Sequence, residues 1–288
     1  STYHSNSLYC NMSHQNASVK SILFALLANL GIAITKTVAA VLTGSGSMLA
    51  ESIHSYADCG NQGLLFLGLK KSKKAPEEEH PLGHGKEIYF WSFIVALMLF
   101  SMGGLFSIYE GIHKLGSHEG LKSPVIAVVV LVISMMLEAA SLYGCISQIN
   151  KIRHNMSLWQ WLRNTRQSEL VVVLGEDVAA LFGLSFALIA VILAMITGNP
   201  VWDAVGSIGI GTLLIFVSVF LAVKVKGLLV GQSADKATRD EIQKYLQSRP
   251  EVEEVLNVIT MQMGENIMVS IKARMVKTDT AESLVRNI

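Results

Sequence analysis

The sequence has few charged residues and almost no excess of either sign. Only 16% of its 288 residues are charged, and the formal net charge at pH 7 is +1. A nucleic-acid partner would need a concentrated basic surface, and this balance argues against one. In addition, 51% of the residues are hydrophobic and the mean hydropathy is +0.45. An ordinary soluble domain of this length would be less apolar and would carry more charge. The composition therefore predicts a membrane protein in a lipid bilayer.

Cysteine is also scarce. The three cysteines, Cys10, Cys59 and Cys145, lie far apart, and two of them fall inside apolar segments. They offer neither a disulfide framework nor a Cys-x-x-Cys metal site. The opening 15 residues have no basic start followed by an apolar run, so they do not read as a signal peptide. No His-Glu-x-x-His motif is present, which argues against a metal-dependent hydrolase.

Long apolar segments make up most of the chain. A spanning helix needs about 20 residues, and six segments reach or approach that length. They run approximately over 19–43, 47–69, 88–112, 124–149, 170–196 and 201–225. The connections over 70–87 and 150–169 are longer and basic, so the positive-inside rule predicts that both termini are cytoplasmic. We expect a polar segment over 1–17 and a six-helix membrane domain over 18–229, in a bacterial inner membrane or an organelle membrane.

The composition changes after residue 229. Charged and apolar residues alternate with a helical period over 235–246, and Pro250 ends that pattern. Residues 252–262 and 267–276 have the β-branched, alternating pattern of strands, with Gly264 in the turn between them. With a second helix expected from Thr280, residues 230–288 predict a small cytoplasmic α+β domain of ferredoxin-like type, incomplete at its C-terminus.

The second apolar segment carries an unusual polar face. The residues Glu51, His54, Asp58, Asn61 and Gln62 recur at the spacing that stacks side chains on one side of a helix. A carboxylate in hydrocarbon is costly, so this face should line a protein interior or a wet cavity and mark a substrate or proton route. His54 and Asp58, one turn apart, offer a nitrogen and an oxygen that suit tetrahedral Zn²⁺. The alternative is a structural polar pair that bridges two helices.

Two motifs resemble those of the cation diffusion facilitator family. Residues 44–58, GSGSMLAESIHSYAD, resemble the motif of the family's second helix, and residues 80–87, HPLGHGKE, resemble the motif before its third helix. Residues 110–115 and the segment from Asp203 also fit, and the resemblance extends over nearly all of the chain from residue 19. It implies a homodimer that exchanges Zn²⁺, as transported substrate, for protons, with no organic cofactor. It also implies a transport site shared by the second and fifth helices.

Asp177 occupies the position of the family's fifth-helix aspartate, but Val173 occupies the position that usually holds histidine. A four-coordinate site then needs another donor, which is Glu176, Glu51 or a water molecule. Glu176 lies about 100° round the helix from Asp177, so both bind one ion only if the helix unwinds or the ion sits between them. The alternative for Glu176 is a supporting hydrogen-bond partner. The acidic pair resembles the branch that contains the animal mitochondrial zinc transporter.

A second group of possible ligands, Glu77, His80 and His84, precedes the third helix. These residues match a surface metal site found in parts of the family, and the alternative is a solvated loop with a structural turn. Three further charges also appear buried, namely Lys36, Glu138 and Asp203. Lys36 could pair with a carboxylate of the bundle. Glu138 could be a proton relay or an interhelical hydrogen-bonding group.

Two smaller features complete the predictions. Small residues four apart, Gly103 with Ser107 and Ser207 with Gly211, predict close packing of the third and sixth helices. Residues 229–288 contain neither histidine nor cysteine. The histidine-built metal cluster that family members often carry in this domain is therefore not expected, and we expect the domain to make dimer contacts instead.

The sequence thus predicts a proton-coupled exporter of divalent metal that works by alternating access. The metal site would use His54, Asp58 and Asp177, with protons competing for the same ligands. Two alternatives stay open. The first is a manganese, iron or cobalt transporter of the same fold, because the missing histidine makes the site harder. The second is a membrane sensor that binds metal without moving it.

Overall fold

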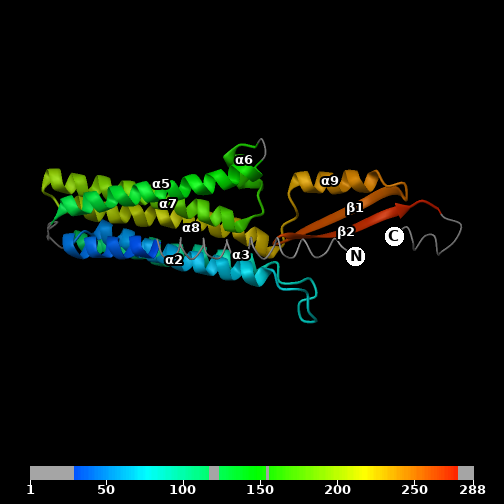
Figure 1. Cartoon of the computed structure of the whole chain (residues 1–288), viewed down its shortest axis with the longest axis horizontal. Coiled ribbons are helices and arrows are strands. Elements are labelled where there is room, and N and C mark those ends of the chain that lie inside the picture. The colour runs from blue at the N-terminus through cyan, green and yellow to red at the C-terminus, as the bar shows by residue number, and fades with distance from the viewer. Residues whose placement is uncertain (1–28, 117–122, 154–155, 278–288) are drawn as a thin grey trace, which may run out of the picture.

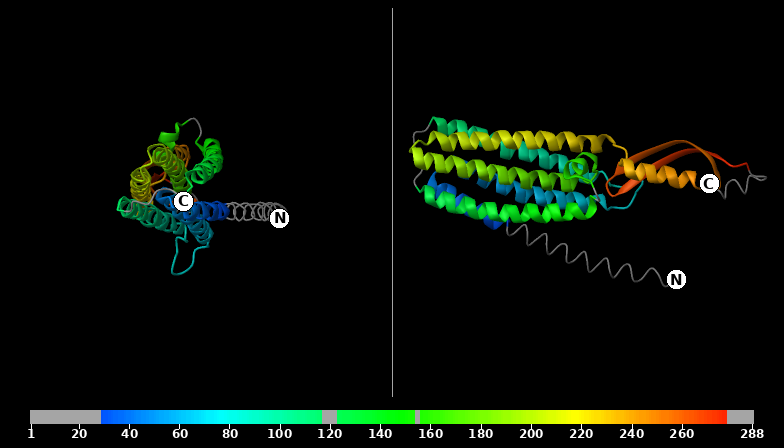
Figure 2. Two further views of the ribbon diagram at one scale, coloured as in Figure 1. Left: turned by 90° about the vertical axis from the view of Figure 1, so that its left-hand side faces the viewer. Right: turned by 90° about the horizontal axis from the view of Figure 1, so that it is seen from above.

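The computed structural model describes residues 29–116, 123–153 and 156–277. Within these ranges, long helices lie side by side in one bundle, and a helix with a two-stranded sheet extends from one end of it (Figure 1). The end-on view in Figure 2 shows the bundle helices grouped around a common axis. The expectations for residues 1–17 and for a helix from Thr280 concern positions outside the described residues.

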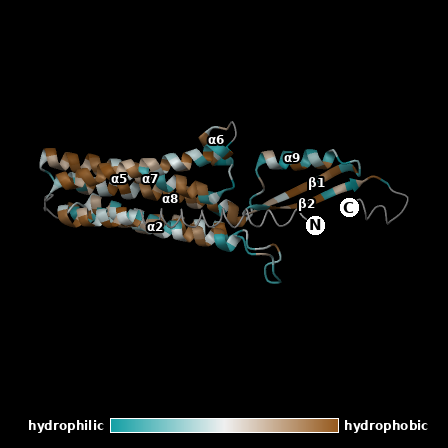
Figure 3. Cartoon of the chain, in the orientation of Figure 1, coloured by the Kyte–Doolittle hydropathy of each residue, from teal (hydrophilic) through white to brown (hydrophobic). Residues whose placement is uncertain are grey.

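Within the ranges that the structure describes, four helices are long and apolar enough to cross a membrane. Their bounds are Glu87–Leu115, made of α3 (Glu87–Met98), η1 (Leu99–Leu105) and α4 (Phe106–Leu115), then α5 (Pro124–Ile152), α7 (Ser168–Thr197) and α8 (Val201–Val230). A shorter apolar helix, Asn29–Thr43, precedes α2 (Gly46–Ser72), whose 27 residues include the polar face. In Figure 3 the brown, hydrophobic colour dominates α5, α7 and α8. The chain is a helical membrane protein with four clear apolar spans.

Ionisable side chains point into the bundle, whereas large apolar side chains both fill its core and cover its outer surface. Helix α2 buries Glu51, His54 and Asn61, whereas α5 exposes Met136 and Tyr143. A soluble bundle would have charged residues on its outer surface. Because lipid solvates apolar side chains and not charges, ionisable residues of a membrane helix are directed to the protein interior.

The third span is not a uniform α-helix. Residues Leu99–Leu105 form a π-helical segment between α3 and α4, which the sequence analysis did not predict. Such segments are frequent at functional sites. A Cβ placed on Gly103 would lie 3.8 Å from Nδ1 of His54, so the wide turn passes beside the polar face of α2.

Glycines bring the third and sixth spans together. A Cβ added to Gly111 on α4 would lie 2.8 Å from the carbonyl oxygen of Ala204 on α8, and one on Gly211 would lie 2.6 Å from the carbonyl oxygen of Gly104. These backbones therefore touch where no side chain intervenes. The predicted close packing of these two helices is confirmed, with Gly104 and Gly111 at the contact.

The polar end of the chain follows the predicted order. Helix α9 (Lys236–Gln247) is capped by Asp235, and the strands β1 (Val252–Met263) and β2 (Asn266–Met275) pair antiparallel. Gly264 adopts a φ of 68° in the turn between them, a conformation that favours glycine. Among the described residues this part is one helix with one two-stranded sheet, so the further elements of a ferredoxin-like domain are not established.

One short helix was missed by the sequence analysis. Helix α6 (Leu158–Asn164) lies in the connection that had been treated as a loop, and Trp161 is buried in it. It starts with a reciprocal capping box, in which the side chains of Ser157 and Gln160 each accept from the other's backbone N–H. Seven residues give too little apolar periodicity to predict a helix.

Candidate metal centre

A small cavity lies where α2, α5 and α7 meet the helix Asn29–Thr43. Its volume is about 30 Å³, which exceeds the roughly 10–15 Å³ that one water molecule needs. Four carboxylate residues line it, Asp58 from α2, Glu138 from α5, and Glu176 and Asp177 from α7. The other lining residues are Asn29, Ile32, Ser55, Gln62, Ser141, Val173 and Ala180.

The two predicted ligands of α2 take different positions. Asp58 lines the cavity, whereas His54 is not among the described residues that line it. Nε2 of His54 lies 3.5 Å from Oδ2 of Asp58, and the histidine side chain is only 1% exposed. Neither ring nitrogen of His54 has a hydrogen-bond partner among the described residues. The imidazole therefore lies next to the cavity carboxylate with its nitrogens available.

Helix α7 contributes Glu176 and Asp177, which both line the cavity. Helix α7 is continuous through them, so local unwinding does not bring the two side chains together. An Nδ2–H of Asn61 donates to Oε1 of Glu176 over 2.5 Å, and the hydroxyl of Ser141 lies 3.3 Å from Oδ2 of Asp177. Each carboxylate is thus oriented by a donor on another helix. Val173 also lines the cavity and supplies no ligand atom.

A buried ion pair borders the cavity. Nζ of Lys36 lies 3.4 Å from Oε2 of Glu51 and 2.8 Å from the hydroxyl of Ser55, which is a lining residue. Lys36 is therefore paired with a carboxylate, as predicted. Oε1 of Glu51 has no hydrogen-bond partner among the described residues, and Glu51 itself is not one of the lining residues.

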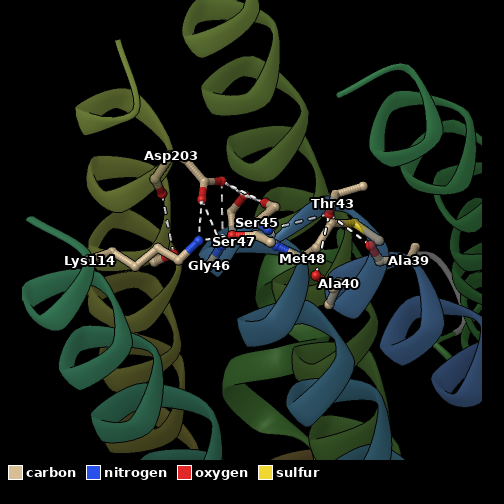
Figure 4. A network of polar contacts seen from close by, with 11 residues as sticks. Ala39, Ala40, Thr43, Ser45, Gly46, Ser47, Met48, Lys114 and Asp203 are labelled. Atoms are coloured by element: carbon tan, nitrogen blue, oxygen red, sulfur yellow. Dashed lines mark hydrogen bonds and ion pairs between the residues drawn. The ribbon is translucent and has the colours of Figure 1, made fainter. Parts of the chain in front are cut away.

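The third predicted buried charge, Asp203, anchors the start of α2 (Figure 4). Its carboxylate is 2% exposed and accepts from the hydroxyl of Ser45 at 2.7 Å, the N–H of Gly46 at 2.6 Å and the hydroxyl of Ser47 at 2.5 Å. Nζ of Lys114 on α4 lies 3.6 Å from the same carboxylate. A negative charge is favourable at a helix N-terminus, so Asp203 fastens α2 to α8 and α4.

The three residues before the third span also come together. Oε1 of Glu77 lies 3.2 Å from Nδ1 of His80 and 3.2 Å from Nε2 of His84. All three possible ligand atoms lie within 4.8 Å of one another. Gly83, with a φ of 76°, makes the turn in which its N–H bonds to the carbonyl of His80 at 2.8 Å. That turn folds His84 back over His80, with the ring centroids 4.3 Å apart.

The sequence did not identify one residue of the cavity, Ser141, or one contact beside it, between Asn61 and Glu176. Ser141, which bonds to Asp177, lies three residues after Glu138 and hence on the same face of α5. This spacing was a usable signal. No sequence signal indicated the hydrogen bond between Asn61 and Glu176, because it depends on how α2 and α7 pack.

Comparisons with known proteins agree with this architecture. The family model described as the cation efflux transmembrane domain matches residues 22–230. The mitochondrial proton-coupled zinc antiporter SLC30A9 of Xenopus laevis is 37% identical over 231 residues, which are 80% of this chain and 41% of that protein. Metal tolerance protein C4 of Arabidopsis thaliana is 33% identical over 208 residues, 72% of this chain and 46% of that protein.

A more distant relative is the magnetosome protein MamB of Magnetospirillum gryphiswaldense, 23% identical over 256 residues, which are 88% of this chain and 80% of that protein. The chain spans less than half the length of the animal and plant relatives that it matches. The match to the family model covers most of the chain and includes all four clear spans. The chain therefore belongs to the cation efflux family, the cation diffusion facilitators, whose members are transporters, and it resembles the animal mitochondrial zinc antiporter.

Proposed function

We propose that this protein is a proton-coupled antiporter that exports divalent metal cations, with Zn²⁺ as the preferred substrate. The observation that supports this most is the cavity of about 30 Å³ in which Asp58 from one helix faces Glu176 and Asp177 from another. Ionisable side chains inside a membrane bundle are costly and usually mark an ion route. A dication supplies the charge that these carboxylates need.

Proton coupling follows from the chemistry of the ligands. A carboxylate must be ionised and an imidazole must be neutral to bind metal, so protons and the metal compete for the same atoms. Rocking of the helices around a fixed site would then expose it to one side of the membrane at a time. Opening toward the more acidic side would release the metal and load protons.

Within this site we assign Asp58 and Asp177 as ligands and His54 as a third. The His54 nitrogens have no other partner among the described residues, and Nε2 lies 3.5 Å from the Asp58 carboxylate. Glu176 either joins them or holds Asp177 in place. Because Val173 offers no nitrogen to the cavity, manganese, iron or cobalt is the second candidate for the substrate.

Transport by the purified protein in vesicles tests this function. We expect Zn²⁺ movement that is driven by a pH gradient, and its loss in Asp58→Ala and in Asp177→Ala. Glu110→Gln on α4 is the matched control, since this carboxylate lies in a span and outside the cavity lining. Normal transport by either alanine variant would make the site assignment wrong. Uptake that stops at one ion per binding site would instead identify a sensor.

We also propose four features that accompany this function. Glu77, His80 and His84 form a second, surface metal site, because their ligand atoms already lie within 4.8 Å of one another. The protein works as a homodimer with both termini in the cytoplasm and six spans, the helix Asn29–Thr43 and α2 being the first two. Chemical cross-linking and the labelling of single cysteines from each side of the vesicle test these proposals.

A further inference from the structure

The inference concerns Glu138, a carboxylate on α5 near the middle of that span. Helix α5 has one narrow buried stripe, and much of the rest of its surface is apolar and exposed. Glu138 and Ser141 fall in line with this stripe, at spacings of three and four residues, but Glu138 is half-buried and Ser141 is exposed, so the stripe opens at these two positions. The buried residues of the stripe are Ala127, Leu131, Ser134, Cys145 and Ile149.

The position on the stripe directs Glu138 to the cavity. Both Glu138 and Ser141 line it, together with Val173, Glu176, Asp177 and Ala180 of α7. Ser141, one turn further along, reaches Asp177 with its hydroxyl, 3.3 Å from Oδ2. The same face of α5 therefore supplies a bond to one carboxylate of the site and a further carboxylate beside it.

Glu138 differs from the other three carboxylates of the cavity in its partners. Asp58 lies beside His54, Glu176 accepts from Asn61, and Asp177 accepts from Ser141. Across the ranges that the structure describes, no hydrogen bond or ion pair to a side chain is found for Glu138. An interhelical structural role would require such a partner, because a carboxylate in a membrane span is costly when nothing compensates it.

The charge of a bound metal provides that compensation. We propose that Glu138 is a direct metal ligand, so that the site is built by three helices, α2, α5 and α7. The inference rests on the proposed transport function and deepens it. Glu138 adds a hard oxygen to a cavity in which Val173 supplies no donor, and with His54, Asp58 and Asp177 it brings the number of protein donors to the four that Zn²⁺ prefers. It also makes the site more oxygen-rich and thus more tolerant of manganese and cobalt.

Metal binding to the purified full chain tests the assignment, with His80→Ala and His84→Ala in all samples to remove the loop residues. We expect Glu138→Gln, which keeps the shape of the side chain, to weaken Zn²⁺ binding at least tenfold and to change the visible absorption of bound Co²⁺. Glu138→Asp should give an intermediate loss. Glu110→Gln, a half-buried carboxylate of another span, should change neither.

A rescue variant separates ligation from a general structural effect. Val173 lines the same cavity, so an imidazole at this position would offer a nitrogen to the metal. We expect Glu138→Gln/Val173→His to regain Zn²⁺ affinity more than Mn²⁺ affinity, because nitrogen favours zinc. A merely structural role for Glu138 predicts no recovery and no change of metal preference.

The outcomes distinguish this inference from the proposed function. If Glu138→Gln keeps the affinity and the Co²⁺ spectrum while Asp58→Ala loses binding, the role of Glu138 is overturned and the transport site stands. If Asp58→Ala and Asp177→Ala both bind metal normally, the site itself is wrong, and the assignment of Glu138 fails with it. Should Glu138→Gln not fold, the comparison of Glu138→Asp with wild type decides the question.

Discussion

The ammonium of Lys36 lies 3.4 Å from the carboxylate of Glu51, and both side chains are 0% exposed. Mutual attraction in a buried pair of this kind offsets the lost hydration only in part, but removal of one partner leaves an uncompensated charge. The hydroxyl of Ser55 joins Lys36 to the wall of the cavity. Lys36 therefore places a positive charge beside a cavity that is lined by several carboxylates.

Lys36→Met should destabilise the protein by about 3–5 kcal/mol, because Glu51 is then buried without its partner. The measurement is the unfolding of the purified protein in detergent. The double variant Lys36→Met/Glu51→Leu should regain most of this stability, since it buries no charge. If Lys36→Met alone unfolds like wild type, the buried pair does not stabilise the fold.

Asn61→Leu removes the amide that donates to Glu176 over 2.5 Å. Loss of a hydrogen bond that orients a ligand typically weakens metal binding by about 10–100-fold, and we expect this range for Zn²⁺ measured against a competing chelator. Cys59→Ala, on the same helix but outside the cavity lining, is the control and should bind normally. Equal affinities of Asn61→Leu and wild type would show that Glu176 needs no support.

Gly111→Ala should separate α4 from α8, because the new methyl group would lie 2.8 Å from the carbonyl oxygen of Ala204. Overpacking of this kind costs about 1–3 kcal/mol, measured by unfolding in detergent. Gly63→Ala on α2 is the matched control, since no atom lies within 4 Å of its added Cβ. The free energy of unfolding of Gly63→Ala should equal or exceed that of the wild type. An equal loss of stability in both variants would show that the α4–α8 contact is not the cause.

His80→Ala with His84→Ala should lower the number of Zn²⁺ ions bound per chain by one, because the loop then keeps only the oxygen of Glu77. The count is made by equilibrium dialysis of the purified protein. Glu79→Ala, an exposed acid of the same loop, should leave the count unchanged. An unchanged count in the double variant would mean that the loop binds no metal.

Acid should loosen the first turn of α9. Burial opposes ionisation of Asp235, but hydrogen bonds from the side chain and backbone of Thr238 outweigh it and lower the pKa of the carboxyl below 3.8. The pKa of Asp235 is lower in the folded state than in the unfolded state. The stability that its ionised carboxylate contributes is therefore fully present above the unfolded-state pKa, and it is lost as the pH falls through the folded-state pKa. We expect α9 amides to exchange faster below about pH 4.

Asp235→Asn provides the control for this acid effect. Asparagine caps a helix about as well as aspartate, so α9 should stay protected at neutral pH and lose only the acid dependence. Asp235→Ala should lose about 0.5–2 kcal/mol of local stability at every pH. Equal acid dependence in Asp235→Asn and wild type would assign the effect to another group.

Elements with a strong local pattern could be predicted closely from the sequence. The strands expected over 252–262 and 267–276 are Val252–Met263 and Asn266–Met275, because alternation and a glycine turn indicate both strands. The register shifts between Val252 and Glu254 and between Val255 and Asn257 were not predicted. The π-helical segment could not be predicted, since it depends on how Gly104 packs against α8 and leaves no mark in the apolar pattern.

The same limit applies to the metal centre. Helical spacing placed His54 and Asp58 on one face of α2, but it could not tell which of them the neighbouring helices leave open to the cavity. Glu138 was expected to be buried but is half-buried, and its place in the cavity with Asp177 depends on the packing of α5 against α7. Patterns along one helix give the direction of a side chain, and contacts between helices decide what it meets.

The attachment of α2 to Asp203 has a mechanical consequence. Since the first turn of α2 is held on α8 and α4, a tilt of α2 would pivot about that end. Asp58 lies twelve residues beyond Gly46, about 18 Å along the axis at 1.5 Å per residue, so a tilt of roughly 10° would swing it by about 3 Å. In the proposed transport site, a tilt of this size would be enough to form or break one metal–ligand bond.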